Sequence, residues 1–156
     1  MTYRTKNVRI RGTMIRLSKL SDYAIVVLSL LAQAHGKVHT ASSLADRTGI
    51  PEPTVAKVLK LLSRQGVIVS IRGVNGGYKM ERSPADVTVT ELIVALEGPI
   101  SVTDCAANEV HDCSIQGLCP LKGRWQRVNQ VIKSALDTLS LADMLVAVPS
   151  RQKGRM

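Results

Sequence analysis

The stretch GIPEPTVAKVLKLLSRQG at residues 49–66, followed by VIVSIRGVNGGYKM at residues 67–80, decides the fold of this chain. Pro51 and Pro53 stand where proline is tolerated, in the first turn of a helix that we expect to run to about Gln65. The apolar residues that share one face of this helix are Val55, Leu59 and Leu62. The stretch therefore predicts an amphipathic helix that ends just before a segment of a different kind.

Two further helices are predicted before it. Apolar residues at helical spacing predict a helix over residues 19–34, with Ser18 or Ser21 as its cap. Thr40 can cap a short second helix that runs through Arg47 and is closed by the glycine that opens the quoted stretch. Two short helices joined by a glycine-containing turn form a helix-turn-helix.

The segment after the third helix predicts a β-hairpin. Val67 to Ile71 is a β-branched run, residues 72–77 (RGVNGG) form a turn, and Tyr78 to Met80 return. A hairpin placed directly after a helix-turn-helix is a wing. We therefore expect a mainly α fold, a winged helix-turn-helix over residues 14–98, with a long C-terminal helix added to it.

In a winged helix-turn-helix the third helix enters the major groove of DNA, and the wing lies against the backbone or the minor groove. The residues best placed to reach base edges are Glu52, Thr54 and Lys57. Those predicted to contact phosphates or the groove are Lys60, Arg64, Arg72, Asn75 and Lys79. Taken alone, the lysines would read as a solvated helix face, and the hairpin after them favours DNA contact.

Charge is distributed in agreement with this expectation. Residues 14–82 hold ten basic and four acidic side chains, whereas residues 83–148 hold four basic and eight acidic ones. The basic ends, residues 1–13 and 149–156, are expected to be disordered and carry little weight. The front half is suited to approach a polyanion. With only one tryptophan and no phenylalanine, the chain lacks the aromatics for stacking single-stranded bases, so we expect double-stranded DNA.

A repeat of apolar residues predicts a dimerisation helix over residues 123–148. The repeat has intervals of 3, 4, 3 and 4 and comprises Trp125, Val128, Ile132, Ala135 and Leu139. Such a seam packs against a partner helix. We expect a homodimer with crossed long helices, which would present two reading heads to a pseudo-palindromic operator.

All three cysteines, Cys105, Cys113 and Cys119, fall in one polar segment, residues 99–122. Three thiolates hold a soft metal centre and leave one coordination position for another ligand. An odd number of cysteines cannot pair completely. The sequence also has no stretch that reads as a membrane helix or secretory signal, so we expect a reducing cytoplasm and metal or redox chemistry.

The residues resemble the IscR/NsrR group of bacterial iron–sulfur transcription regulators. The resemblance rests on LSKLSDYA at 17–24, the helix-turn-helix, the wing RGVNGGY, ELIVALEGPI at 91–100 and the cysteine segment followed by a helix. It covers residues 14 to about 145. Within this group, CPLKGRWQRVN at 119–129 and SLADML at 140–145 are similar to regulators of the SUF iron–sulfur assembly system.

The resemblance implies a 2Fe-2S or 4Fe-4S cluster on the three cysteines and DNA binding that changes with cluster state. By analogy, a cluster-loaded dimer represses iron–sulfur assembly genes. Some relatives place a histidine three residues after the third cysteine, where this chain has Lys122, which cannot ligate. Others recruit an aspartate from the partner's first helix, and Asp22 matches that position, although it could equally cap the helix. Within the loop, His111 or Asp112 would also serve as the fourth ligand.

Three alternatives stay open at the level of sequence. Structural zinc would satisfy the same cysteines together with His111. A nitric oxide sensor would use the same kind of cluster. An enzyme or redox carrier is disfavoured because the chain has no CxxC pair, no glycine-rich phosphate loop and no paired carboxylate site.

Overall fold

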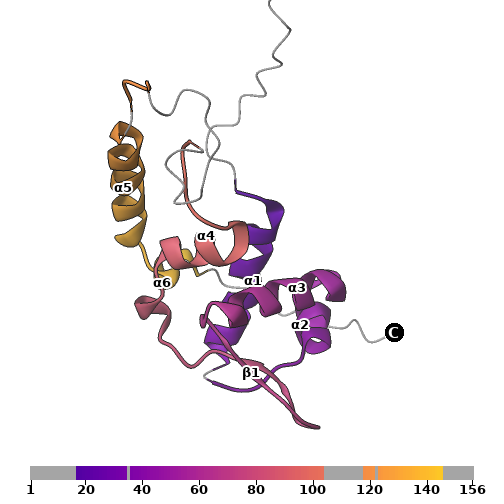
Figure 1. Cartoon of the computed structure of the whole chain (residues 1–156). Helices are drawn as coiled ribbons and strands as arrows, with labels where there is room; N and C mark the ends of the chain where they lie inside the picture. The colour runs from indigo at the N-terminus through magenta and orange to yellow at the C-terminus, as the bar shows by residue number, and fades with distance from the viewer. Residues whose placement is uncertain (1–16, 35, 104–117, 122, 146–156) are drawn as a thin grey trace, which may run out of the picture.

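The computed structural model describes residues 17–34, 36–103, 118–121 and 123–145. Over these residues the chain is mainly helical with one small antiparallel hairpin, as the sequence predicted (Figure 1). Its elements are, in order, α1 (Lys19–Gln33), α2 (Ala41–Thr48), α3 (Glu52–Arg64), β1 (Val69–Ile71), β2 (Gly77–Lys79), the 3-10 turn η1 (Pro84–Asp86), α4 (Val89–Glu97), α5 (Arg124–Asp137) and α6 (Leu141–Met144). None of these helices is long and apolar enough to cross a bilayer.

Local sequence signals set the ends of the first three helices. The Ser18 hydroxyl accepts a hydrogen bond from the N–H of Leu20 and caps α1. The Thr40 hydroxyl accepts from the N–H of Ser43 at 3.1 Å and caps α2, and Gly49 in the left-handed conformation ends that helix. Pro51 precedes the first turn of α3. The predicted helix-turn-helix is therefore present.

Helices α1 to α4 enclose one hydrophobic core. Each helix contributes the face on which its apolar residues recur, and burying one such side chain stabilises the fold by about 1.5–3 kcal/mol. The largest fully buried side chains are Leu28, Leu30, Leu31, Leu44, Leu59, Leu62, Ile68 and Leu141. Because Leu141 belongs to α6, the C-terminal segment is fastened to the same core.

The wing is wider than a two-stranded hairpin. Strands β1 and β2 pair with Val69 opposite Lys79 and Ile71 opposite Gly77. On the other side of β2, the backbone of His39 exchanges two hydrogen bonds with Tyr78, at 2.9 and 2.8 Å. The segment just before α2 thus flanks the wing, which extends away from the helices at the opposite end of the molecule from α5 (Figure 1).

The C-terminal helix is shorter than predicted. One helix was expected over residues 123–148, but α5 ends at Asp137 and Leu139 lies in the link to α6. The link is held by two backbone hydrogen bonds: Val89 N–H donates to the Leu139 carbonyl at 2.9 Å, and Leu141 N–H donates to the Val87 carbonyl at 2.7 Å. These tertiary bonds replace helical ones, so the prediction of one continuous helix beyond Asp137 is wrong.

Candidate nucleic-acid interface

The outer face of α3 carries a polar strip. The opposite face of the helix faces the core and carries the buried residues Val58, Leu59 and Leu62. Helices α1, α2 and α4 pack against α3. The sequence predicted five DNA-contacting residues on this helix. Four of them are exposed, namely Glu52, Lys57, Lys60 and Arg64, and Thr54 is half-buried. With three cations and one carboxylate, the strip suits a polyanionic partner.

The wing presents a second polar surface. A hydrogen bond from Gly76 N–H to the Gly73 carbonyl, at 2.9 Å, closes its turn, and Arg72 and Asn75 are both exposed there. Lys79, half-buried on β2, forms an ion pair with Glu81 at 2.6 Å. An ion pair with a carboxylate this exposed contributes little to stability, so a phosphate can replace the carboxylate.

His39 joins the wing to the helix-turn-helix, a role that the sequence did not reveal. Its Nε2 is buried and has no hydrogen-bond partner in the described part of the chain. Burial lowers the pKa of His39, and the nearby charges of Arg47 and Lys37 lower it further, so the imidazole is neutral at pH 7. Arg47 and Lys37 therefore add two cations beside the wing that sequence reasoning missed.

The segment that leaves the wing is locked onto the start of α4. The Arg82 guanidinium donates to both carboxylate oxygens of Glu91, at 3.0 and 3.2 Å, and to the Asp86 carbonyl at 2.6 Å. Glu91 also accepts from the N–H of Thr88, completing a capping box. The hydrogen bond from Arg82, above all, lowers the pKa of Glu91.

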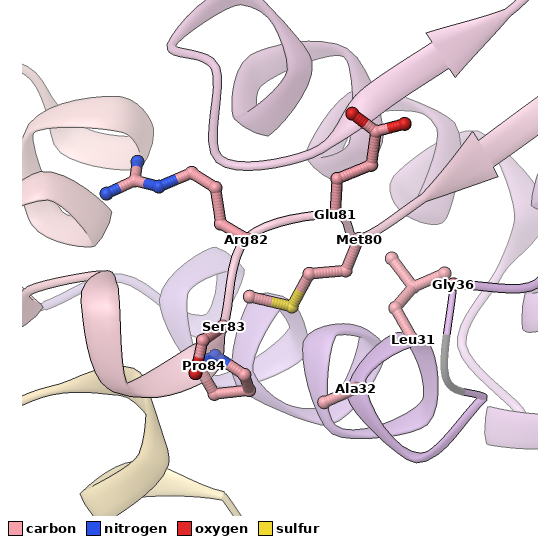
Figure 2. Close-up of a pocket in the computed structure, with 8 residues that line it drawn as sticks. All are labelled: Leu31, Ala32, Gly36, Met80, Glu81, Arg82, Ser83 and Pro84. Atoms are coloured by element: carbon pink, nitrogen blue, oxygen red, sulfur yellow. The ribbon is translucent and has the colours of Figure 1, made fainter.

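An open pocket lies beside the Arg82–Glu91 ion pair, between the end of α1, the end of the wing and η1 (Figure 2). Its lining includes the buried side chains of Leu31 and Met80. The charged groups of Glu81 and Arg82 point away from it in Figure 2.

The other end of α4 is tied to the start of α1. One carboxylate oxygen of Glu97 accepts three hydrogen bonds, from the N–H of Ser18 at 2.9 Å and from the hydroxyls of Ser18 and Ser21 at 2.6 Å each. These bonds, chiefly that of the Ser18 hydroxyl, lower the pKa of Glu97. The sequence does not predict this contact, because Ser18 and Ser21 lie 79 and 76 residues before Glu97.

Helix α5 is fastened to α4 and to the segment that leads toward Cys105. The Asn129 side chain, only 8% exposed, donates from Nδ2 to the Ile100 carbonyl at 2.9 Å. The Thr90 hydroxyl donates to the Lys133 carbonyl at 3.3 Å. The start of the cysteine segment is thereby held between α4 and α5.

The predicted metal ligands are only partly within the described residues. Cys119 is half-buried, free of any disulfide, and lies just before α5. Cys105, Cys113, His111 and Asp112 lie outside those residues, which contain no group of three or more side chains able to hold a metal ion. Asp22 is exposed in the first turn of α1, and the cap of that helix is Ser18, so a capping role for Asp22 is excluded.

The seam on α5 is largely open to solvent. Val128 is 43% exposed, and Trp125 and Ala135 are exposed as well. Val131, which the predicted seam did not include, is 63% exposed and lies one helical turn from Val128. Ile132 is half-buried. An amphipathic helix normally buries its apolar stripe, so this face lacks a partner within the described part of the chain.

The model of one protein family, described as Rrf2, iron-dependent transcriptional regulator, matches residues 17–147. The chain belongs to the Rrf2 family. An rrf2-like HTH-type transcriptional regulator from Rhodobacter capsulatus is 32% identical over 112 residues, covering 69% of this chain and 75% of that protein. The HTH-type transcriptional regulator CymR of Bacillus subtilis is 28% identical over 144 residues, covering 91% of this chain and 98% of that protein.

Solved structures of Rrf2 regulators share the fold. The structure of CymR, described as the global cysteine regulator of B. subtilis, aligns with a TM-score of 0.59 and 27% identity, over 84% of this chain and 96% of that one. IscR from T. potens aligns with a TM-score of 0.54 and 31% identity, over 83% of this chain and 85% of that one. Both neighbours support the winged-helix regulator family.

Family membership confirms the broad function predicted from the sequence. Rrf2 proteins are DNA-binding transcriptional regulators, so the chain is a regulator and not an enzyme. The match extends from α1 to just past α6 and therefore includes both the winged helix and the cysteine segment.

Proposed function

We propose that this Rrf2 protein is an iron–sulfur-sensing repressor of iron–sulfur (SUF) assembly genes, acting in the cytoplasm. The observation that carries the proposal is the free, half-buried thiol of Cys119 directly before α5, in a chain whose family is described as iron-dependent. The likeness to IscR, at 31% identity, supports the same assignment. Cys105, Cys113 and Cys119 would hold the cluster, of 2Fe-2S or 4Fe-4S type.

The DNA partner is a double-stranded, pseudo-palindromic operator. The strip on α3 would enter the major groove, with Glu52, Thr54 and Lys57 at its N-terminal end reaching base edges. Phosphate and groove contacts would come from Lys60, Arg64, Arg72, Asn75 and Lys79. The exposure of most of these side chains supports this assignment.

A homodimer would be formed through the open face of α5. Covering Trp125, Val128, Ile132 and Ala135 with the same face of a second copy would remove apolar surface that one chain leaves in water. In that assembly Asp22, exposed on α1, is free to serve as the fourth ligand, and His111 is the alternative within the loop.

Contacts in the structure connect the cysteine segment to the DNA-binding head. When bound, an iron–sulfur cluster supplies a cross-link between thiolates that is sensitive to iron and to oxidants. Asn129 holds the start of the segment, at Ile100, against α5, and Glu97 ties the end of α4 to α1. Arg82 and Glu91 join the first turn of α4 to the segment that leaves the wing. If binding or loss of the cluster changes the conformation of the cysteine segment, the wing would therefore shift relative to α1.

The proposal is tested by anaerobic purification, followed by a visible spectrum and by iron, sulfide and zinc assays on one sample. A brown protein with iron and sulfide in stoichiometric amounts is expected, and changing any of the three cysteines to alanine should bleach it. Ser114→Ala, in the same segment but without loss of a thiol, is the control and should stay brown.

Three other results would redirect the proposal. One zinc per chain in a colourless protein would indicate a structural Cys3His site with His111. A colourless protein without metal, whose DNA binding responds to thiol oxidation or to a cysteine metabolite, would favour a regulator similar to CymR. A cluster that reacts with nitric oxide while leaving iron limitation without effect would indicate a nitric oxide sensor.

A further inference from the structure

The tip of the wing carries an apolar side chain that no other part of the described chain covers. Val74 is 104% exposed, as open to water as in an isolated extended peptide. It occupies the second position of the turn from Gly73 to Gly76, with Asn75 after it. Exposed apolar residues are ordinary on protein surfaces when taken singly. This one calls for an explanation because of its place in the molecule.

Neither turn chemistry nor packing accounts for a valine here. Central turn positions favour proline, glycine, asparagine, aspartate and serine, and β-branched side chains fit extended strands better. The positions after Asn75 require glycine, because a Cβ on Gly76 would lie 2.4 Å from the Ile71 carbonyl oxygen and one on Gly77 would lie 2.5 Å from the His39 carbonyl oxygen. Val74 lies beyond the paired residues of both strands, at the tip of this closely packed backbone.

The surroundings of Val74 point to a nucleic-acid groove. Arg72, two residues before it, is exposed and forms no ion pair within the described residues. Residues 67–80 contain no acidic side chain. A wing that carries an unpaired arginine beside an apolar tip matches proteins that combine a cation with an apolar side chain in the minor groove.

We propose that Val74 is a specificity residue that lies in the minor groove and disfavours G·C pairs beneath the wing. This inference rests on the proposed operator binding. In the minor groove, guanine is distinguished by its N2 amino group, whereas A·T and T·A pairs present only acceptors. A valine cannot accept a hydrogen bond, so it would leave a buried N2–H donor unpaired. An A·T pair at the same position has no such donor.

The test uses the full-length protein and a duplex selected by it from a random-sequence library. Base pairs under each wing are then changed from A·T to I·C, G·C or 2,6-diaminopurine·T. The I·C pair resembles G·C in the major groove but lacks the minor-groove amino group. We expect I·C to bind like A·T, and G·C and diaminopurine·T to bind about tenfold more weakly.

Val74→Thr keeps the shape of the side chain and adds a hydroxyl that accepts a hydrogen bond. It should bind G·C and A·T flanks within about twofold of each other, with the melting temperature unchanged because the Val74 side chain is fully exposed. Val69→Thr, the same change at the root of the wing on β1, is the control and should keep the tenfold discrimination.

Equal weakening by I·C and G·C would overturn the inference, since it would place the readout in the major groove. Discrimination that persists unchanged in Val74→Thr, or that is absent from the unmodified protein, would overturn it as well. If instead the protein selects no duplex at all, the proposed operator binding fails, and this outcome is distinct from a selected duplex that is insensitive to its flanks.

Discussion

Lys60 and Leu62 are near neighbours on α3 with opposite environments. Leu62 is fully buried and Lys60 is exposed. We predict that Leu62→Ala lowers the free energy of unfolding by about 2–5 kcal/mol, because it removes core packing and leaves a cavity. Denaturation with urea, followed by circular dichroism, measures the loss. A loss below about 1 kcal/mol would contradict the placement of this face in the core.

Lys60→Ala should behave in the opposite way. Its free energy of unfolding is expected to stay within about 0.5 kcal/mol of the unmodified protein. The plot of log Kd against log salt for the selected duplex should lose about one unit of slope per chain, because one phosphate contact disappears. An unchanged slope with unchanged affinity would remove Lys60 from the interface.

His39 should make the stability of the winged helix-turn-helix depend on pH. Its pKa is lowered in the folded protein from the ordinary value of 6.5, so the unfolded chain binds a proton first as the pH falls. The contribution of His39 to the free energy of unfolding is therefore complete above pH 6.5, and it is lost as the pH falls from 6.5 through the folded pKa. We predict that His39→Gln flattens this loss in thermal unfolding, and an equal loss in both proteins would contradict the assignment.

At the scale of elements, α5 should control the oligomeric state. We predict that Val128→Asp and Val131→Asp each convert a dimer into monomers at micromolar concentration, because they place a charge in the middle of the apolar face. Lys133→Asp, on the same helix but away from that face, is the control and should leave the dimer intact. Sedimentation equilibrium distinguishes the two masses, and an unchanged mass in all variants would exclude this face as the interface.

The sequence predicted those elements whose signals are local. Ser18, Thr40 and Pro51 mark helix starts, and the periodicity of Val55, Leu59 and Leu62 marks a buried face, so α1 to α3 and the wing followed directly. The break after Asp137 could not be predicted. It is imposed by backbone bonds to Val87 and Val89, and these exist only once α4 and α6 lie together.

In the candidate site, too, features with local sequence signals could be predicted and those set by tertiary contacts could not. The cations of α3 and the wing could be read from helical spacing and from a turn. The pairing of His39 with β2 and the bonds of Glu97 to Ser18 and Ser21 could not, because the partners are distant in sequence and none belongs to a motif. Residue types alone therefore predict the proposed contact surface but not the contacts that position it.

In the whole molecule, α4 lies between the winged helix and the start of the cysteine segment. Its first turn is bound to the segment leaving the wing through Arg82 and Glu91, and its last residue is bound to the start of α1 through Glu97. Helix α5 then holds the segment after α4 through Asn129. Helix α4 therefore has direct contacts with the segment that leaves the wing, with α1 and with α5.

Iron–sulfur sensing is best tested by measuring the affinity of one anaerobic preparation for its selected duplex, before and after a chelator removes the cluster. We expect an iron- and sulfide-containing protein whose Kd rises about tenfold or more when the cluster is lost, since coupling energies of this kind typically lie at about 1–3 kcal/mol. The Cys119→Ala protein should already show the weaker affinity. Identical affinities in the loaded and cluster-free states would contradict the claim that this protein senses iron–sulfur status.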